Sequence, residues 1–163
     1  MKRILLTVVI FTTLIGGGVG AVSEGVVGAV SVNCASIVGQ LKNVRYYDRR
    51  AREYLGNRYE RLIGGYVTNL NVRLVRNNMA NVELQRLQVE LVAAHSSFKS
   101  EYGRYATEMD QLIGMDCVGR PEAFYKSLEG VRERRAGVRW WVERVNEGLA
   151  EYRAVVEEMR GRL

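Results

Sequence analysis

Proline, histidine and cysteine are nearly absent from this 163-residue sequence. It contains one Pro, one His and two Cys, which lie far apart along the chain. So few His and Cys at such spacing do not form the ligand pattern of a zinc site. The single His would have to serve any serine-nucleophile triad, and the sequence has no nucleophile-elbow or phosphate-loop pattern. The sequence therefore predicts a protein that is not an enzyme and holds no cofactor or metal.

The scarcity of proline, with a hydrophobic fraction of 47%, also argues against a disordered chain. A chain of this length can form one domain with its own core. Its formal net charge is +6, with most of the basic residues being Arg. Residues 42–76 and 120–163 are basic, whereas residues 82–116 are acidic. This order suits pairing between helices of one chain, so we do not expect nucleic acid as a partner.

Residues 1–23 have the pattern of an export signal. Two basic residues precede an apolar run at 4–15, and small residues that suit a signal peptidase follow it. An uncleaved membrane anchor is the alternative, because residues 4–22 carry no charge and are long enough to span a bilayer. Both interpretations place the rest of the chain outside the cytoplasm, either secreted or associated with the cell envelope. Residues 24–33 are interpreted as a spacer.

Apolar residues recur every three or four positions over the rest of the chain, which indicates long helices. The expected helices span residues 35–76, 82–114 and 121–162. The third is the clearest, since its apolar seam runs from Phe124 to Leu163. The links between the helices are short and make consecutive helices antiparallel neighbours. The predicted fold is therefore all-α, an elongated antiparallel three-helix bundle or coiled coil over residues 34–163.

The first helix has the weakest pattern. Its apolar stripe is expected to pass through Leu55, Leu62, Tyr66 and Leu70. The pair Gly64–Gly65 weakens a helix, so we expect a bend or fraying there.

Polar residues also interrupt the seams and the links. Asp48 falls in the seam of the first helix, and Arg135 breaks the seam of the third. We expect Arg135 to lay its aliphatic stem on the seam and to reach out to an acid. The asparagines within residues 76–81 are expected to stop one helix and to cap the next.

The two cysteines lie at related places in this arrangement. Cys34 stands at the start of the first helix, and Cys117 lies in the link before the third. Because the first two helices are antiparallel, the end of the second returns toward the start of the first. A disulfide between Cys34 and Cys117 is the expected state in an exported chain. Two free thiols and an intermolecular bridge are the alternatives.

Two stretches are candidates for interaction surfaces. Residues 42–62 interleave Arg with Tyr, as a surface for anionic polymers does, although pairing with the acidic second helix is the simpler interpretation. The candidates in this stretch are Arg45, Tyr46, Arg49, Arg50 and Arg52. The second stretch holds Trp140 and Trp141. Trp141 is expected at the edge of the seam and Trp140 outside it, where it can contact a protein, a glycan, a membrane or a neighbouring Arg.

The order of these features resembles a known group of proteins. A cysteine opens an Arg/Tyr-rich helix, an asparagine turn follows, and then come "ELQRLQVELVAAHSSFKSEYGRY" and "DC" with "FYKSLEGVRERRAGV". This order is similar to that of exported two-cysteine coiled-coil proteins of candidate-phyla-radiation (Patescibacteria) type bacteria, a group without an assigned activity. The resemblance covers residues 33–160. It implies an envelope-associated or secreted helical protein and carries over no catalytic residue.

These observations favour a non-enzymatic exported scaffold or protein-interaction module of the cell envelope. Its protein partner is not identified by the sequence, and the coiled-coil faces also allow a homo-oligomer. Membrane association is expected only through residues 4–22. A periplasmic holdase-type chaperone is one alternative function, and a membrane-tethered coiled-coil spacer is another.

Overall fold

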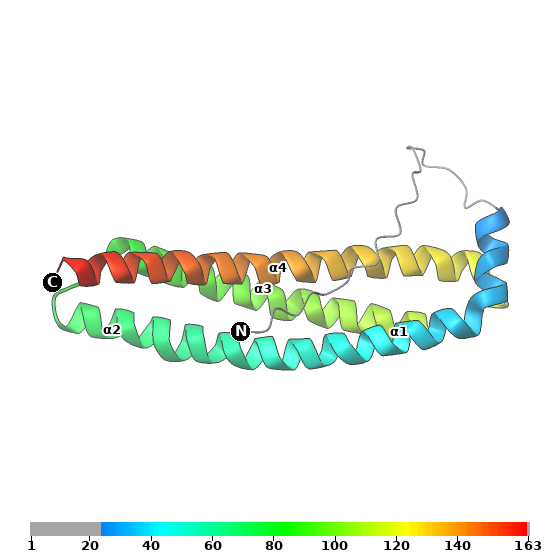
Figure 1. Cartoon of the computed structure of the whole chain (residues 1–163), viewed down its shortest axis with the longest axis horizontal. Helices are drawn as coiled ribbons and strands as arrows, with labels where there is room; N and C mark the ends of the chain where they lie inside the picture. The colour runs from blue at the N-terminus through cyan, green and yellow to red at the C-terminus, as the bar shows by residue number, and fades with distance from the viewer. Residues whose placement is uncertain (1–23, 163) are drawn as a thin grey trace.

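The structure is a computed structural model that describes residues 24–162, and over that range it is helical without a strand. Its elements are α1 (Glu24–Tyr59), the π-helix η1 (Glu60–Val67), α2 (Thr68–Arg76), α3 (Val82–Ile113) and α4 (Pro121–Gly161). The all-α prediction is confirmed. Figure 1 shows that α1, η1 and α2 form one continuous rod, which lies beside α3 and α4 in an elongated molecule. The proposed signal or anchor lies outside the described residues.

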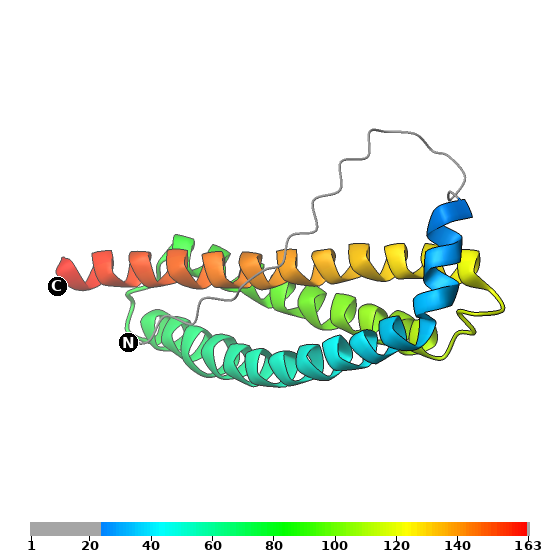
Figure 2. The same cartoon turned by 45° about the vertical axis from the view of Figure 1, so that its right-hand side comes forward.

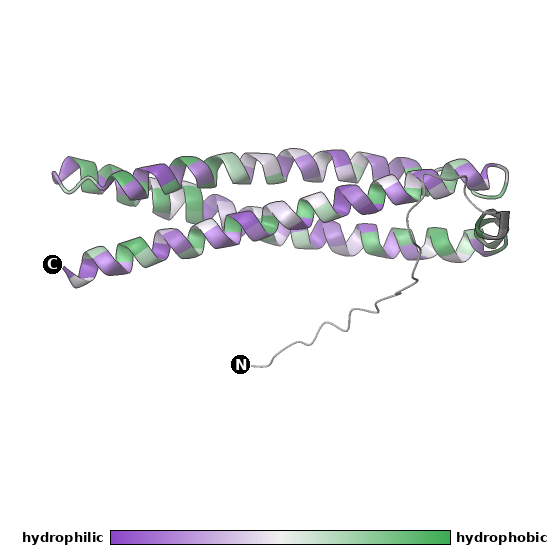
Figure 3. Cartoon of the chain, turned by 90° about the horizontal axis from the view of Figure 1, so that it is seen from above, coloured by the Kyte–Doolittle hydropathy of each residue, from purple (hydrophilic) through white to green (hydrophobic). Residues whose placement is uncertain are grey.

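The pairing of α3 with α4 forms the most extensive contact between elements. Leu84, Leu87 and Leu91 of α3 and Val145 of α4 are buried in one cluster. Gly148 allows a close approach there, because a Cβ atom at this position would lie 3.0 Å from Leu91 Cδ2. Each helix mixes hydrophobic and hydrophilic residues along its length (Figure 3), as expected when only one face is covered.

The links between the helices follow ordinary capping rules. Asn78 adopts a φ of 55°, in the left-handed region that asparagine tolerates. The side chain of Asn81 accepts a hydrogen bond from the Leu84 N–H at 3.0 Å and caps α3. The predicted stop and cap in this link are thus confirmed. Pro121 begins α4, where its missing N–H leaves no helical hydrogen bond unmade.

The start of α1 differs from the sequence-based expectation. Helix α1 begins at Glu24, so residues 24–33 are helical and the first helix starts before the expected residue 35. Burial of Val30 among the residues around Phe124 explains this extension, since it adds apolar contact that a loose spacer would lack. The first turns of α1, blue in Figures 1 and 2, bend sharply away from the axis of the rest of the rod.

The rod continues through Gly64–Gly65 as a π-helix. Its buried side chains there are Tyr59, Ile63 and Val67, each four residues from the next. A π turn holds more residues than an α turn, so a spacing of four keeps these side chains on one face. Tyr66 is 70% exposed. The helix is thus neither frayed nor interrupted at Gly64–Gly65 as expected but changes to π geometry, and the predicted place of Tyr66 in the apolar stripe is wrong.

The core has two parts, one near each end of the molecule. The part near the α3–α4 link contains Leu41, Tyr105, Met109, Leu112, Phe124 and Val131. The other part contains Tyr59, Ile63, Leu84, Leu87, Leu91, Phe98, Val145 and Tyr152. The polar side chain of Asp48 reaches Tyr105 between the helices. Besides the two apolar parts, a polar contact between α1 and α3 thus helps to fix how these helices align.

Candidate functional site

Cys34 on α1 and Cys117 in the α3–α4 link form a disulfide with Cα atoms 5.7 Å apart. This separation lies in the usual range for a disulfide. Cys117 is buried, and Cys34 packs against the same apolar cluster. The bond therefore attaches the bent start of α1 to the link that joins α3 to α4.

Asp48, Arg135 and Tyr105 join the three rods. Asp48 accepts hydrogen bonds from Arg135 Nε at 2.7 Å, from Arg135 Nη2 at 2.9 Å and from the Tyr105 hydroxyl at 2.5 Å. Burial acts to raise the pKa of Asp48, but the hydrogen bonds from Arg135 and Tyr105 outweigh it and lower this pKa. The prediction that Arg135 reaches from the seam to an acid is confirmed. The acid is Asp48, which the sequence analysis identified only as a polar residue that interrupts the apolar seam.

Replacing Asp48 by Asn is expected to destabilise the protein by about 1–2 kcal/mol, because the charge that accepts three hydrogen bonds is lost. The matched control is Asp110→Asn, which removes another bidentate Arg–Asp pair between two helices. The Asp48 side chain is 19% exposed and that of Asp110 is 59% exposed. The control should therefore cost less, within about 1 kcal/mol. Equal losses in urea unfolding of the two variants would contradict the structural role assigned to Asp48.

Arg45 is a link between α1 and α3 rather than a free surface group. Its Nε and Nη2 atoms bind the Asp110 carboxylate at 2.8 and 2.9 Å, and its Nη1 donates to the Tyr102 hydroxyl at 3.1 Å. Among the described residues, this is the one ion pair between α1 and α3. The expected pairing of the basic first helix with the acidic second is therefore limited to Arg45, because acids such as Glu101 and Glu108 bind Arg134 of α4 instead.

Five other Arg and Tyr residues of α1 form an exposed surface. Tyr47 is 67% exposed and Tyr54 is 66% exposed. Arg50 stacks over the ring of Tyr46 at 5.7 Å and donates to its hydroxyl at 3.1 Å. Arg49 lies 4.0 Å from Glu53, a weak and exposed pair. We call Tyr46, Tyr47, Arg49, Arg50 and Tyr54 the α1 outer stripe.

The sequence analysis missed two members of this stripe. Tyr47 and Tyr54 are seven residues apart, which places them on one helix face away from the apolar seam. This seven-residue spacing could have identified both tyrosines as members of an exposed face from the sequence alone. Arg52, by contrast, lies outside the stripe: its guanidinium sits 5.8 Å from the centre of the Tyr102 ring and lines a groove between the rods.

Trp140 and Trp141 lie on α4, and their ring centres are 4.4 Å apart in an edge-to-face contact. Trp141 packs against the core part that contains Val145, whereas Trp140 is half exposed. Both positions agree with the register expected from the heptad spacing. The tryptophans lie on α4, and none of the ring contacts among the described residues joins them to the α1 outer stripe. The two candidate surfaces are therefore distinct.

A second polar group, which the sequence analysis missed, ties α2 to α3 and α4. The Tyr152 hydroxyl donates to Asn71 Oδ1 at 2.9 Å, and Asn71 Nδ2 donates to the Leu84 carbonyl at 3.0 Å and to Gln88 Oε1 at 2.6 Å. Asn71 and Tyr152 are buried, so each hydrogen bond compensates for the loss of water around a buried polar atom. Asn71 falls on the buried face only because the π-helix shifts that face.

His95 is buried beside Tyr59 and Phe98, and its Nε2 atom has no hydrogen-bond partner among the described residues. Burial lowers the pKa of His95 below its ordinary value of 6.5, and Lys99 and Arg52 add to this effect while Glu60 opposes it. No acid is bonded to the ring, so we interpret His95 as a neutral core residue.

Acidification should therefore weaken the fold through His95. Since the pKa of His95 is lower in the folded state, the unfolded chain binds more protons as the pH falls below about 6.5, and the free energy of unfolding decreases. We expect the wild type to lose stability between pH 7.5 and pH 5.5. His95→Leu should lose much less over that range. An equal loss in both proteins, measured by thermal unfolding, would show that another group titrates.

No three His, Cys, Asp or Glu side chains within residues 24–162 come together as a metal-binding group. In the same range, none of the helices combines the length and hydrophobicity needed to cross a membrane. Comparison with protein-family models, curated proteins and solved structures found no match to the chain. The geometry of the exposed residues is therefore the basis for inferring function.

Proposed function

We propose that the protein is a non-enzymatic exported scaffold of the cell envelope, built as a three-helix coiled coil and preceded by a signal segment. The observation that carries this proposal is the α1 outer stripe. Its tyrosines are exposed although the seam on the other side of α1 is covered. Tyr and Arg are enriched at protein interfaces, where large flat side chains give contact area at a small entropy cost.

The charge of the stripe narrows the kind of partner. Among the described residues, Arg50 has a side-chain hydrogen bond to Tyr46 alone, and Arg49 faces Glu53 at the limit of an ion pair. Positive charge is thus in excess beside exposed tyrosines, and a protein with an acidic surface is complementary to it. The disulfide supports an extracytoplasmic location, because such bonds persist in oxidising compartments.

The test is site-specific crosslinking in the producing cells. A photoreactive amino acid replaces Tyr47 in one variant and Val89 of α3 in the control, positions that are 67% and 69% exposed. We expect a discrete adduct from position 47, absent from position 89. The double variant Arg49→Glu/Arg50→Glu should remove that adduct, whereas Arg153→Glu on α4 should retain it. Equal crosslinking at positions 47 and 89 would contradict the proposal.

A holdase-type chaperone remains the main alternative, since such proteins also combine export, basic charge and long helices. A chaperone should suppress the aggregation of a heat-unfolded client protein at a near-stoichiometric ratio. The scaffold should leave that aggregation unchanged. A membrane-tethered spacer is distinguished by the N-terminus of the mature chain, because it would retain residues 4–22.

A further inference from the structure

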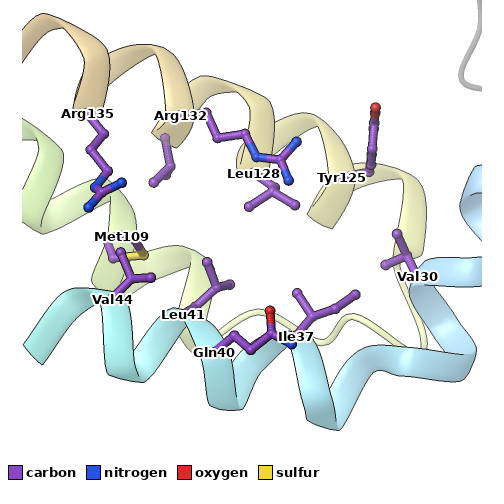
Figure 4. Close-up of a pocket in the computed structure, with 11 residues that line it drawn as sticks. Val30, Ile37, Gln40, Leu41, Val44, Met109, Tyr125, Leu128, Arg132 and Arg135 are labelled. Carbon is purple, nitrogen blue, oxygen red and sulfur yellow. The ribbon is translucent and has the colours of Figure 1, made fainter. Parts of the chain in front are cut away.

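A cavity of about 410 Å³ lies between α1 and α4 near the disulfide, with Met109 of α3 in its lining. Figure 4 shows side chains of α1 facing those of α4 across it. The apolar lining residues are Val30, Ile37, Leu41, Val44, Met109, Leu128 and Val131. A mostly apolar cleft of this size between helices is the usual form of a small-molecule site.

One polar group of this lining, Arg132, favours a negative charge. Arg132, Arg135, Gln40 and Tyr125 complete the lining, which contains no acidic residue. Arg135 is already bound to Asp48. Arg132 takes part in none of the ion pairs found among the described residues, and in Figure 4 its guanidinium lies beside Leu128 at the cavity. Within residues 24–162, Arg132 is thus an exposed cation without an ion pair at the side of an apolar chamber.

The shape of the cavity suits a narrow chain better than a helix. Its lining on α4 runs from Tyr125 to Arg135, about 15 Å at the rise of an α-helix. At the Arg135 end, the bridge from Arg135 to Asp48 joins α4 to α1 and would obstruct a helix lying along the groove. A flexible hydrocarbon chain can fill the space without displacing that bridge.

The disulfide fixes one wall of this chamber. Cys34 lies between Val30 and Ile37 on α1, and its bond to Cys117 anchors that part of the helix to the α3–α4 link. The wall is therefore held in place before a ligand enters, which lowers the entropy cost of binding.

We propose that this cavity binds a medium-chain fatty acid, with its carboxylate on Arg132 and its hydrocarbon chain among the apolar residues of α1, Met109 and α4. Recognition of this ligand requires both features, since an apolar chamber alone would accept a neutral alcohol equally well. An Arg–carboxylate pair adds a charge-assisted hydrogen bond that the alcohol cannot form.

The test is calorimetric titration of the disulfide-bonded protein with dodecanoate, below its micellar concentration. The comparison ligands are dodecanol and dodecyltrimethylammonium, which share the chain but lack the anion. We expect one dodecanoate per chain and an affinity about tenfold or more above that for dodecanol. Arg132→Gln should lower the dodecanoate affinity by about tenfold. Arg153→Gln, which removes an exposed Arg of the same helix, should leave it unchanged.

A second variant tests the hydrocarbon part. Val44→Phe narrows the chamber and should weaken dodecanoate and dodecanol alike, and its thermal unfolding shows whether it is folded. The proposal is overturned by absent dodecanoate binding, by equal affinity for dodecanol, or by an unchanged Arg132→Gln variant. Binding to phosphatidylglycerol vesicles without binding of dodecanoate would assign the surface to a membrane. A dimer in sedimentation that Val44→Phe dissociates would assign it to a second copy.

Discussion

Loss of the Cys34–Cys117 bond is expected to lower the free energy of unfolding by about 4 kcal/mol. The bond joins residues separated by 83 positions, so it removes much of the conformational entropy of the unfolded chain. For a domain of this size, the melting temperature should fall by roughly 10 °C. Circular dichroism of Cys34→Ser/Cys117→Ser measures both the melt and the helix content.

Helix content should remain nearly native in this double variant at low temperature. The buried residues of α3 and α4 do not depend on the bond, and most of the α3–α4 contact lies away from it. Adding a reductant to the wild type should give the same melting temperature as the variant, and reductant should leave the variant unchanged. A wild type whose melt does not respond to reductant would contradict a stabilising disulfide.

Val145→Asp is expected to have the largest effect of any single substitution. Val145 has 0% exposure and packs in the core part that contains Leu84, Leu87 and Leu91. An Asp there would be a buried charge without a partner, at a cost of about 4 kcal/mol or more. Since small domains are stable by about 5–15 kcal/mol, this substitution should remove between about a quarter and most of the free energy of unfolding.

The control for this substitution is Val89→Asp, which introduces the same side chain at a position that is 69% exposed. It should change stability by about 0.5 kcal/mol or less. Val142 and Leu149 on the same seam are only half buried, so Asp at either should cost less than at Val145. Urea unfolding of the four variants orders these costs. A Val145→Asp protein that unfolds like Val89→Asp would show that α4 does not pack on α3 as described.

The regular helices could be predicted from sequence because their seams follow a constant period. The structure places α3 at Val82–Ile113 and α4 at Pro121–Gly161, within one residue of the expected ends. Asparagine and proline at these ends act locally, through φ preference and missing donors, so their effect is visible without knowledge of the fold.

The first rod was harder to predict for two physical reasons. A π-helix inserts residues into the turn, so a search with an α-helical period displaces the buried face that it assigns from there on, although Leu70 and Leu74 still pack against the core as expected. Asn71 and Val67 were missed for this reason. The helical start of α1 was missed because Val30 gains its burial from α4 and the α3–α4 link, which are distant in sequence. Local patterns carry no information about such contacts.

The candidate surface was predicted only in part. An Arg-rich stretch does not show which arginines are paired, because that depends on acids in other helices. Arg45 is bound by Asp110 and Tyr102, whereas Arg50 remains on the outside. The useful signal was the position of Tyr47 and Tyr54 opposite the seam, which locates the exposed face once the buried one is known.

The most direct single measurement is non-reducing peptide mass spectrometry of the mature protein isolated from the envelope and medium of its producing cells. We predict a peptide pair linking Cys34 to Cys117 within monomers. The same spectra should show a mature N-terminus that follows the apolar segment at residues 4–15. Free thiols, or cross-links found only between chains, would contradict the proposed exported scaffold, in which the first helix is bonded to the α3–α4 link.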